Sequence, residues 1–172
     1  KIIGIGETGL DFYYNNSKKK DQIESFEEHI YAAQETGLPL IIHTRSAEEE
    51  THQILEKHLK KKEFKFLIHC FTGTREFAFK LIDIDAFISA SGVITFKKSS
   101  DLASIFKDLP NEKILVETDA PYLAPVPLRG KSNEPSYIIH TVKFLSELKK
   151  LPFDKFAQIT TNNFYNLFGK LQ

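Results

Sequence analysis

The sequence has little cysteine, no net charge and no long apolar run. Its single cysteine, Cys70, excludes an internal disulfide framework and is typical of a reducing compartment. The 23 basic and 23 acidic side chains cancel, which argues against a broadly basic nucleic-acid binder but allows nucleic acid to be contacted at a local site. No apolar run approaches the roughly 18 residues of a membrane span, and nothing at the start resembles a signal peptide. We therefore expect a cytoplasmic protein with no membrane partner.

The remaining composition is typical of one folded domain. The 172 residues are 41% hydrophobic and 27% charged, and fifteen Phe and six Tyr can supply a core. No linker or low-complexity segment divides the chain, so we expect residues 1–172 to form a single domain. The sequence contains no methionine and opens within an apolar run, so we expect translation to begin upstream of Lys1.

Short apolar runs alternate with longer amphipathic stretches along the chain. The runs predict buried strands at 1–5, 38–42, 64–68, 86–90 and 113–117. The amphipathic stretches predict helices at 18–36, 46–59, 74–82, 99–109, 135–150 and 153–168. This alternation predicts an α/β fold of right-handed parallel βα units, either a doubly wound open sheet or a (β/α) barrel. Because a barrel normally has eight strands in about 250 residues, this chain would supply about five βα units and an extra C-terminal helix.

Four side chains that can bind metal each follow a different apolar run. They are Glu7, His43, His69 and Asp119. The carboxyl ends of parallel strands meet at one edge of a sheet, where functional sites are built. Carboxylate and imidazole groups are normal ligands of zinc, manganese or iron, and a carboxylate can bridge two cations. The structural alternative is four separate polar residues with local hydrogen bonds, but their equivalent positions favour a metal site.

Three basic residues lie near these candidate ligands. Arg45 is two residues past His43, and Arg129 and Lys131 lie in a long loop at 120–134. Arginine is suited to bidentate contact with phosphate. We expect the three side chains to form a compact phosphate-binding site over the metals.

Two other phosphate-binding patterns are rejected. Residues 4–9 (GIGETG) match the dinucleotide pattern G-x-G-x-x-G, but Glu7 would repel a pyrophosphate. The next strand also ends in His43 instead of the acidic residue that would hold a ribose. The run Gly130-Lys131-Ser132 resembles the end of a P-loop, but Pro125 stands where glycine is required.

Three further residues with reactive side chains are expected to have no role in the site. Cys70 follows His69 and should point to the other side of its strand as a small buried residue. His52 and His58 are six residues apart, a spacing that does not place them on one helix face, so we expect both to be solvated.

Several longer motifs resemble those of the TatD-type metal-dependent deoxyribonucleases. They lie at residues 6–11 (GETGLD), 42–45 (IHTR), 68–73 (IHCFTG), 116–123 (VETDAPYL), 127–135 (PLRGKSNEP) and 160–168 (TTNNFYNLF). The resemblance covers essentially the whole chain in order. It implies a (β/α)8 TIM barrel related to the amidohydrolases, two divalent metal ions (Mg, Zn or Mn) and hydrolysis of phosphodiesters.

The resemblance also implies a role for each candidate ligand. Glu7 would bridge the two metals. His43 and His69 would hold one metal, and Asp119 would hold the other. Asp119 is also the best catalytic candidate to orient or deprotonate an attacking water, because it ends a strand within reach of a metal. Glu117 and Thr118 would support Asp119 without binding the metal themselves.

One family signature has no counterpart in this sequence. The family carries an H-x-H pair on its first strand, and no H-x-H occurs here. The first apolar run corresponds to the family's fourth strand, so we expect the C-terminal part of a TIM-barrel hydrolase. Its open sheet edges favour self-association. Without the two histidines we expect metal to be absent, single or weakly held.

We expect the full-length enzyme to act on DNA with a metal-activated water. Two alternatives stay open. The first is a metal hydrolase of another small phosphoester or an amide, because the same ligands would serve. The second is a truncated, non-catalytic interaction protein, which the missing H-x-H supports.

Overall fold

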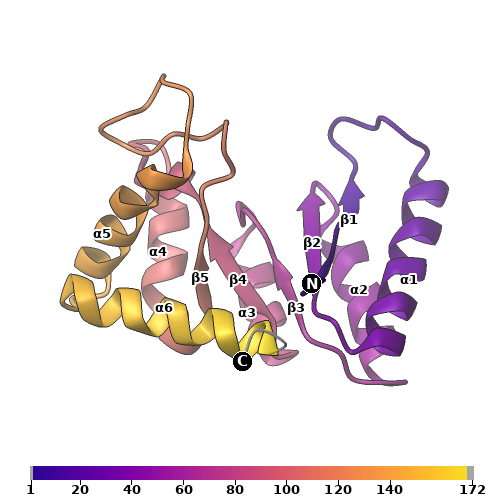
Figure 1. Ribbon diagram of the computed structural model, residues 1–172. Coiled ribbons are helices and arrows are strands. Elements are labelled where there is room, and N and C mark those ends of the chain that lie inside the picture. The colour runs from indigo at the N-terminus through magenta and orange to yellow at the C-terminus, as the bar shows by residue number, and fades with distance from the viewer. Residues whose placement is uncertain (1, 170–172) are drawn as a thin grey trace.

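Five short strands form one parallel sheet in the computed structural model, which describes residues 2–169 (Figure 1). The strands are β1 (Ile5–Asp11), β2 (Leu40–Arg45), β3 (Phe66–Ile68), β4 (Phe87–Ala90) and β5 (Ile114–Val116). Their order in the sheet is β1-β2-β3-β4-β5, and every neighbouring pair is parallel. This confirms the predicted α/β fold. A sequential order without a reversal is that of a barrel segment and not of a doubly wound sheet.

Helices connect the strands and close the described part of the chain. They are α1 (Lys19–Thr36), α2 (Glu48–Leu59), α3 (Arg75–Asp83), α4 (Ser100–Asp108), α5 (Ile138–Leu148) and α6 (Phe153–Leu167), with short 3-10 turns at η1 (Gly92–Thr95), η2 (Asn111–Lys113) and η3 (Pro135–Tyr137). Figure 1 shows α2 to α4 behind the sheet, α1 at the right beside β1, and α6 passing across the front. Within residues 2–169, no helix is both long and apolar enough to cross a lipid bilayer.

The two faces of the sheet are buried by different elements. Alternate strand residues point toward the helices behind the sheet and are at most 1% exposed: Ile42, Ile68, Ile88 and Ile114. The residues between them point to the opposite face, which corresponds to the inside of a barrel. There a smaller apolar cluster joins strand residues to the end of α6: Leu67, Phe87, Leu115, Leu167 and Phe168.

The first strand lies later in the chain than its apolar residues predict. The expected strand was at 1–5, whereas β1 pairs with β2 as far as Asp11 opposite Arg45. Gly9 lies opposite His43, and a Cβ atom at Gly9 would sit only 2.0 Å from the carbonyl oxygen of His43. Glycine therefore permits this close pairing of the two strands. Glu7 and His43 lie within strands, because pairing continues after the apolar pattern stops.

His58 is buried, so the expectation that it is solvated is wrong. Its side chain is 0% exposed, and its Nε2 atom lies 3.2 Å from Oε1 of Glu27 on α1. The same carboxylate accepts a hydrogen bond from Nζ of Lys57 at 2.7 Å. Spacing within α2 could not reveal this, because the partner comes from the helix packed beside it.

Candidate metal site

The structure brings the four candidate ligands to the carboxyl edge of the sheet. Glu7 and His43 project from β1 and β2, His69 directly follows β3, and Asp119 comes shortly after β5. Asp119 has a φ angle of 56°, in the left-handed region that is uncommon for residues other than glycine. Unusual backbone conformations of this kind cluster at functional sites.

Three of these side chains form a small triangle of ligand atoms. Oε1 of Glu7 lies 3.2 Å from Nδ1 of His43 and 3.0 Å from Nε2 of His69. The two histidine nitrogens are 3.4 Å apart. Ligand atoms held about 2.0–2.1 Å from a tetrahedral zinc ion lie about 3.3–3.4 Å apart, so the triangle is close to the size that a small cation needs.

Each histidine of the triangle is held from behind by a second carboxylate. Nε2 of His43 lies 3.1 Å from Oδ2 of Asp11, and Nδ1 of His69 lies 3.2 Å from Oε1 of Glu117. A carboxylate can only accept, so these ring nitrogens donate and leave the opposite nitrogens to face Glu7. This carboxylate–histidine arrangement is characteristic of metal sites, where it fixes the orientation and tautomer of the ligand.

A second group of possible ligands shares His69. Ligand atoms of His69, Glu117 and Asp119 all lie within 4.8 Å of one another. Burial of Asp119 and the neighbouring charge of Glu117 raise the pKa of the Asp119 carboxyl above its usual value. A carboxylate in such an acidic neighbourhood is suited to bind a cation or to accept a proton.

The neighbouring carboxylates raise the pKa of the half-buried His69. Burial alone would lower the pKa of His69, but the hydrogen bond and charge of Glu117, aided by Glu7, raise it to about 9. Burial also pushes the pKa of Glu117 upward, whereas hydrogen bonds from His69 and Ser89 lower it overall. At neutral pH the metal-free site therefore holds a proton on His69 that a bound cation would displace.

A cavity of about 560 Å³ lies against these residues on the inner face of the sheet. The acidic and histidine side chains in its lining are Glu7, His69, Glu117 and Asp119. The rest is lined mainly by apolar side chains of the strands and of α6, including Leu67, Leu115 and Phe164. The candidate ligands therefore line this cavity and are not enclosed in the hydrophobic core.

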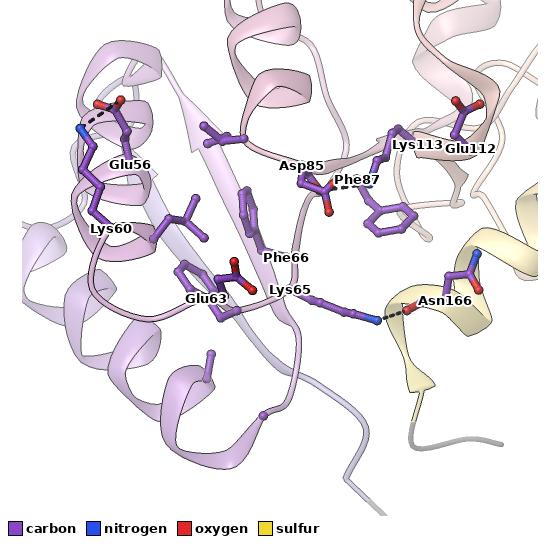
Figure 2. Close-up of a pocket in the computed structure, with 15 residues that line it drawn as sticks. Glu56, Lys60, Glu63, Lys65, Phe66, Asp85, Phe87, Glu112, Lys113 and Asn166 are labelled. Atoms are coloured by element: carbon purple, nitrogen blue, oxygen red, sulfur yellow. Dashed lines mark hydrogen bonds and ion pairs between the residues drawn. The ribbon is translucent and has the colours of Figure 1, made fainter.

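A larger cavity, of about 1010 Å³, lies at the opposite edge of the sheet (Figure 2). Lys65, Phe87 and Lys113 line it where β3, β4 and β5 begin. Its lysines are already engaged: Lys113 pairs with Asp85 at 2.5 Å, and Nζ of Lys65 donates to the carbonyl oxygen of Asn166 at 2.5 Å. Size alone would favour this cavity, but the convergent ligands belong to the smaller one.

The three expected phosphate-binding residues each have different surroundings in the structure. The guanidinium of Arg45 lies over the ring of Tyr13, and that of Arg129 lies 4.4 Å from the ring centroid of Phe96. Lys131 is exposed in the loop after Asp119. The joint role of these three residues in binding phosphate stays a prediction.

Cys70 lies closer to the site than its strand position predicts. A φ angle of 44° turns the chain at Cys70, and Sγ lies 3.2 Å from Oγ of Ser91. Burial, together with the charges of Glu117 and Asp119, raises the pKa of the Cys70 thiol to about 12. The thiol therefore stays protonated at neutral pH, which agrees with a packing role and not with a nucleophile.

Asp11 is the functional candidate that sequence reasoning missed. It belongs to the motif at 6–11 but received no role. A usable signal was present: residues 7, 9 and 11 of an extended strand project from the same face, so Asp11 shares a side with Glu7. The apolar pattern predicts a strand at 1–5, and that strand ends before Glu7 and Asp11, so it does not show that they share a face.

The fold is a parallel βα segment of a TIM-type barrel, with candidate histidine and carboxylate metal ligands at its carboxyl edge. The family described as "TatD related DNase" matches residues 1–169, and the chain belongs to this family. The predicted resemblance is thereby confirmed.

Curated relatives and solved structures agree with this assignment. The chain is 44% identical over 168 residues to an uncharacterized metal-dependent hydrolase of Buchnera aphidicola and 42% identical over 167 residues to YcfH of Escherichia coli K12, which has the same description. These matches cover 98% and 97% of this chain but only 63% of each relative. The crystal structure of the TatD homolog YjjV of Escherichia coli superposes with a TM-score of 0.89 at 28% identity, over 98% of this chain and 64% of that one.

Proposed function

We propose that this chain carries most of the metal site of a deoxyribonuclease that hydrolyses DNA phosphodiester bonds. One observation carries the proposal: Glu7, His43 and His69 converge on a triangle of the right size, with Asp11 and Glu117 behind the histidines. The names of the curated relatives support a metal-dependent hydrolase. DNA as the substrate is supported by the family description.

The side chains of the site have different proposed roles in hydrolysis: binding metal, accepting a proton and contacting phosphate. A divalent cation held by Glu7, His43 and His69 would supply Lewis acidity toward the phosphate and lower the pKa of water. A carboxylate oxygen of Asp119 accepts the proton of the attacking water, and its raised pKa brings it nearer to the pH at which a base works best. Arg45, Arg129 and Lys131 are proposed to neutralise and orient the phosphate.

Two further carboxylates, those of Asp11 and Glu117, are proposed to orient the two histidines. Asp11 and Glu117 accept hydrogen bonds from the ring nitrogens that face away from Glu7. They hold the imidazoles in one tautomer, and their negative charge strengthens each ring as a ligand. Their proposed role is positioning, because neither has to contact the substrate.

The test is a substrate panel with the complete natural protein that contains this chain. Single-stranded DNA, duplex DNA, a small phosphodiester and an amide are incubated with a divalent metal or with a chelator. We expect DNA hydrolysis that the chelator abolishes and that Glu7→Gln reduces by about 10² or more, as for loss of a group that acts in the transition state. Glu24→Gln, which alters an exposed ion pair with Lys20 on α1, is the matched control and should cleave normally.

Each competing function predicts a different result of this panel. Metal-dependent cleavage of only the small phosphodiester or the amide would replace DNA by another substrate. No hydrolysis of any substrate with any divalent metal would favour a non-catalytic interaction protein.

A further inference from the structure

Two adjacent tyrosines stand on the surface beside the ligand cluster. Tyr13 and Tyr14 lie in the loop between β1 and α1 and are 63% and 61% exposed. Their ring centroids are 5.1 Å apart with the planes at 87°. Aromatic rings that only pack a loop against the fold are normally buried. Because these two rings are mostly exposed, most of their area is free to contact another molecule.

A positive charge lies directly against both rings. The guanidinium of Arg45, at the end of β2, is 4.1 Å from the ring centroid of Tyr13 and 4.6 Å from that of Tyr14. Exposed Lys18 ends the same loop, and exposed Lys19 begins α1. Exposed aromatic rings interleaved with basic side chains are the usual surface for unpaired nucleic acid, because rings stack on bases and cations contact phosphates.

One carboxylate links this surface to the metal site. Oδ1 of Asp11 accepts hydrogen bonds from the backbone N–H groups of Tyr13 at 3.0 Å and Tyr14 at 2.8 Å. Oδ2 of the same residue accepts the hydrogen bond from His43 at 3.1 Å. The backbone that carries the tyrosines is therefore fixed relative to a proposed metal ligand, only one side chain away.

We propose that Tyr13, Tyr14 and Arg45 form an aromatic platform that binds an unpaired nucleotide next to the phosphodiester to be cleaved. The rings stack on the base and Arg45 contacts an adjoining phosphate. Bases inside a duplex already stack on their neighbours, so the platform selects single-stranded or frayed DNA. The inference rests on the proposed deoxyribonuclease function and deepens it by naming the part of the substrate that is recognised.

The test measures binding apart from cleavage, with the metal-loaded complete natural protein. Hydrolysis-resistant phosphorothioate strands are used: a single strand with bases, the same strand without bases, and a duplex. The wild type should prefer the strand with bases over the abasic strand. Tyr13→Leu with Tyr14→Leu should reduce this preference at least about fivefold, the lower range for loss of base stacking, whereas Tyr13→Phe with Tyr14→Phe should retain it.

Controls separate the platform from general effects on the fold. The Leu changes keep the backbone N–H groups that Asp11 binds, and both side chains are exposed, so folding should persist. Tyr31→Leu changes a tyrosine that is 42% exposed on α1 and packs against His58, and it should leave DNA binding unchanged.

The outcomes distinguish the platform from the proposed function. The platform is refuted if the wild type binds both single strands equally, or if the Leu variant keeps the full preference for bases, even when DNA is hydrolysed normally. If the preference depends on the tyrosines but metal-loaded protein cleaves no DNA, the platform stands and the nuclease assignment fails.

Discussion

Glu117 holds His69 from the side opposite to Glu7. The Nδ1 atom of His69 lies 3.2 Å from Oε1 of Glu117, while Nε2 of the same ring lies 3.0 Å from Oε1 of Glu7. The ring therefore bridges two carboxylates through its two nitrogens, and only Nε2 faces the triangle of candidate ligands. Asp11 holds His43 in the corresponding way.

Removing the charge behind either histidine should weaken metal binding. We expect Glu117→Gln or Asp11→Asn to lower the affinity for Zn²⁺ or Mn²⁺ by about 10–100-fold, the usual effect of losing a carboxylate behind a metal-bound histidine. Competition with a chromophoric chelator measures this affinity. Asp83→Asn, at the exposed end of α3, is the control. Unchanged affinity in both variants would mean that these carboxylates serve the fold alone.

Asp119 should matter for the chemical step. Asp119→Asn keeps the size of the side chain but removes the charge and the proton-accepting oxygen. We expect the rate of DNA hydrolysis by the complete natural protein to fall by about 10² or more. Cleavage at a near-normal rate would contradict the assigned role of Asp119.

The partly buried Glu27 of α1, which contacts Lys57 and His58 of α2, should make stability depend on pH. Hydrogen bonds from Lys57 and His58 lower the pKa of Glu27 below its usual value of 4.5. A lowered pKa in the folded state adds stability above the unfolded-state value, and this stability is lost as pH falls through the folded-state value. Glu27→Gln should therefore reduce the free energy of unfolding by about 1 kcal/mol at pH 7, since a charged acceptor becomes neutral.

Urea unfolding at several pH values checks this prediction. The difference between the wild type and Glu27→Gln should shrink as the pH falls below the usual value of Glu27, where the wild-type carboxyl also becomes neutral. Glu28→Gln, an exposed neighbour on the same helix, should show little difference at any pH. A constant difference for Glu27→Gln across the whole range would argue against the ion pair.

The 172-residue segment produced alone should self-associate. Among the described strands, β1 and β5 each have a single neighbour, so each presents an unpaired edge. The inner face also exposes an apolar cavity between the strands and α6. Open edges and exposed apolar surface favour association. Light scattering coupled to size exclusion should give a mass above that of one chain, and a stable monomer would show that the edges are protected.

The sequence pattern identifies the candidate site residues that come directly after an apolar run. His69 directly follows β3, so its position was visible from the apolar run alone. Glu7 was recognised although its strand was misplaced. Asp11 received no role because β1 continues through polar residues that local hydropathy does not reveal.

Tertiary partners account for the remaining differences. His58 is buried because Glu27 of another helix lies against it, and a spacing rule within one helix contains no such information. Cys70 turns toward Ser91 because its backbone adopts a left-handed conformation after the strand. Arg45 lies against two tyrosine rings of the neighbouring loop, and its position in the sequence does not reveal these partners.

The central claim is that Glu7, His43 and His69 bind a divalent cation. Anomalous diffraction from crystals of the complete natural protein grown with Zn²⁺ or Mn²⁺, recorded at the metal absorption edge, tests it most directly. The account predicts an anomalous peak about 2.0–2.2 Å from a Glu7 oxygen, Nδ1 of His43 and Nε2 of His69. A metal-loaded, DNA-cleaving crystal form whose anomalous peaks all lie away from these three atoms would contradict it.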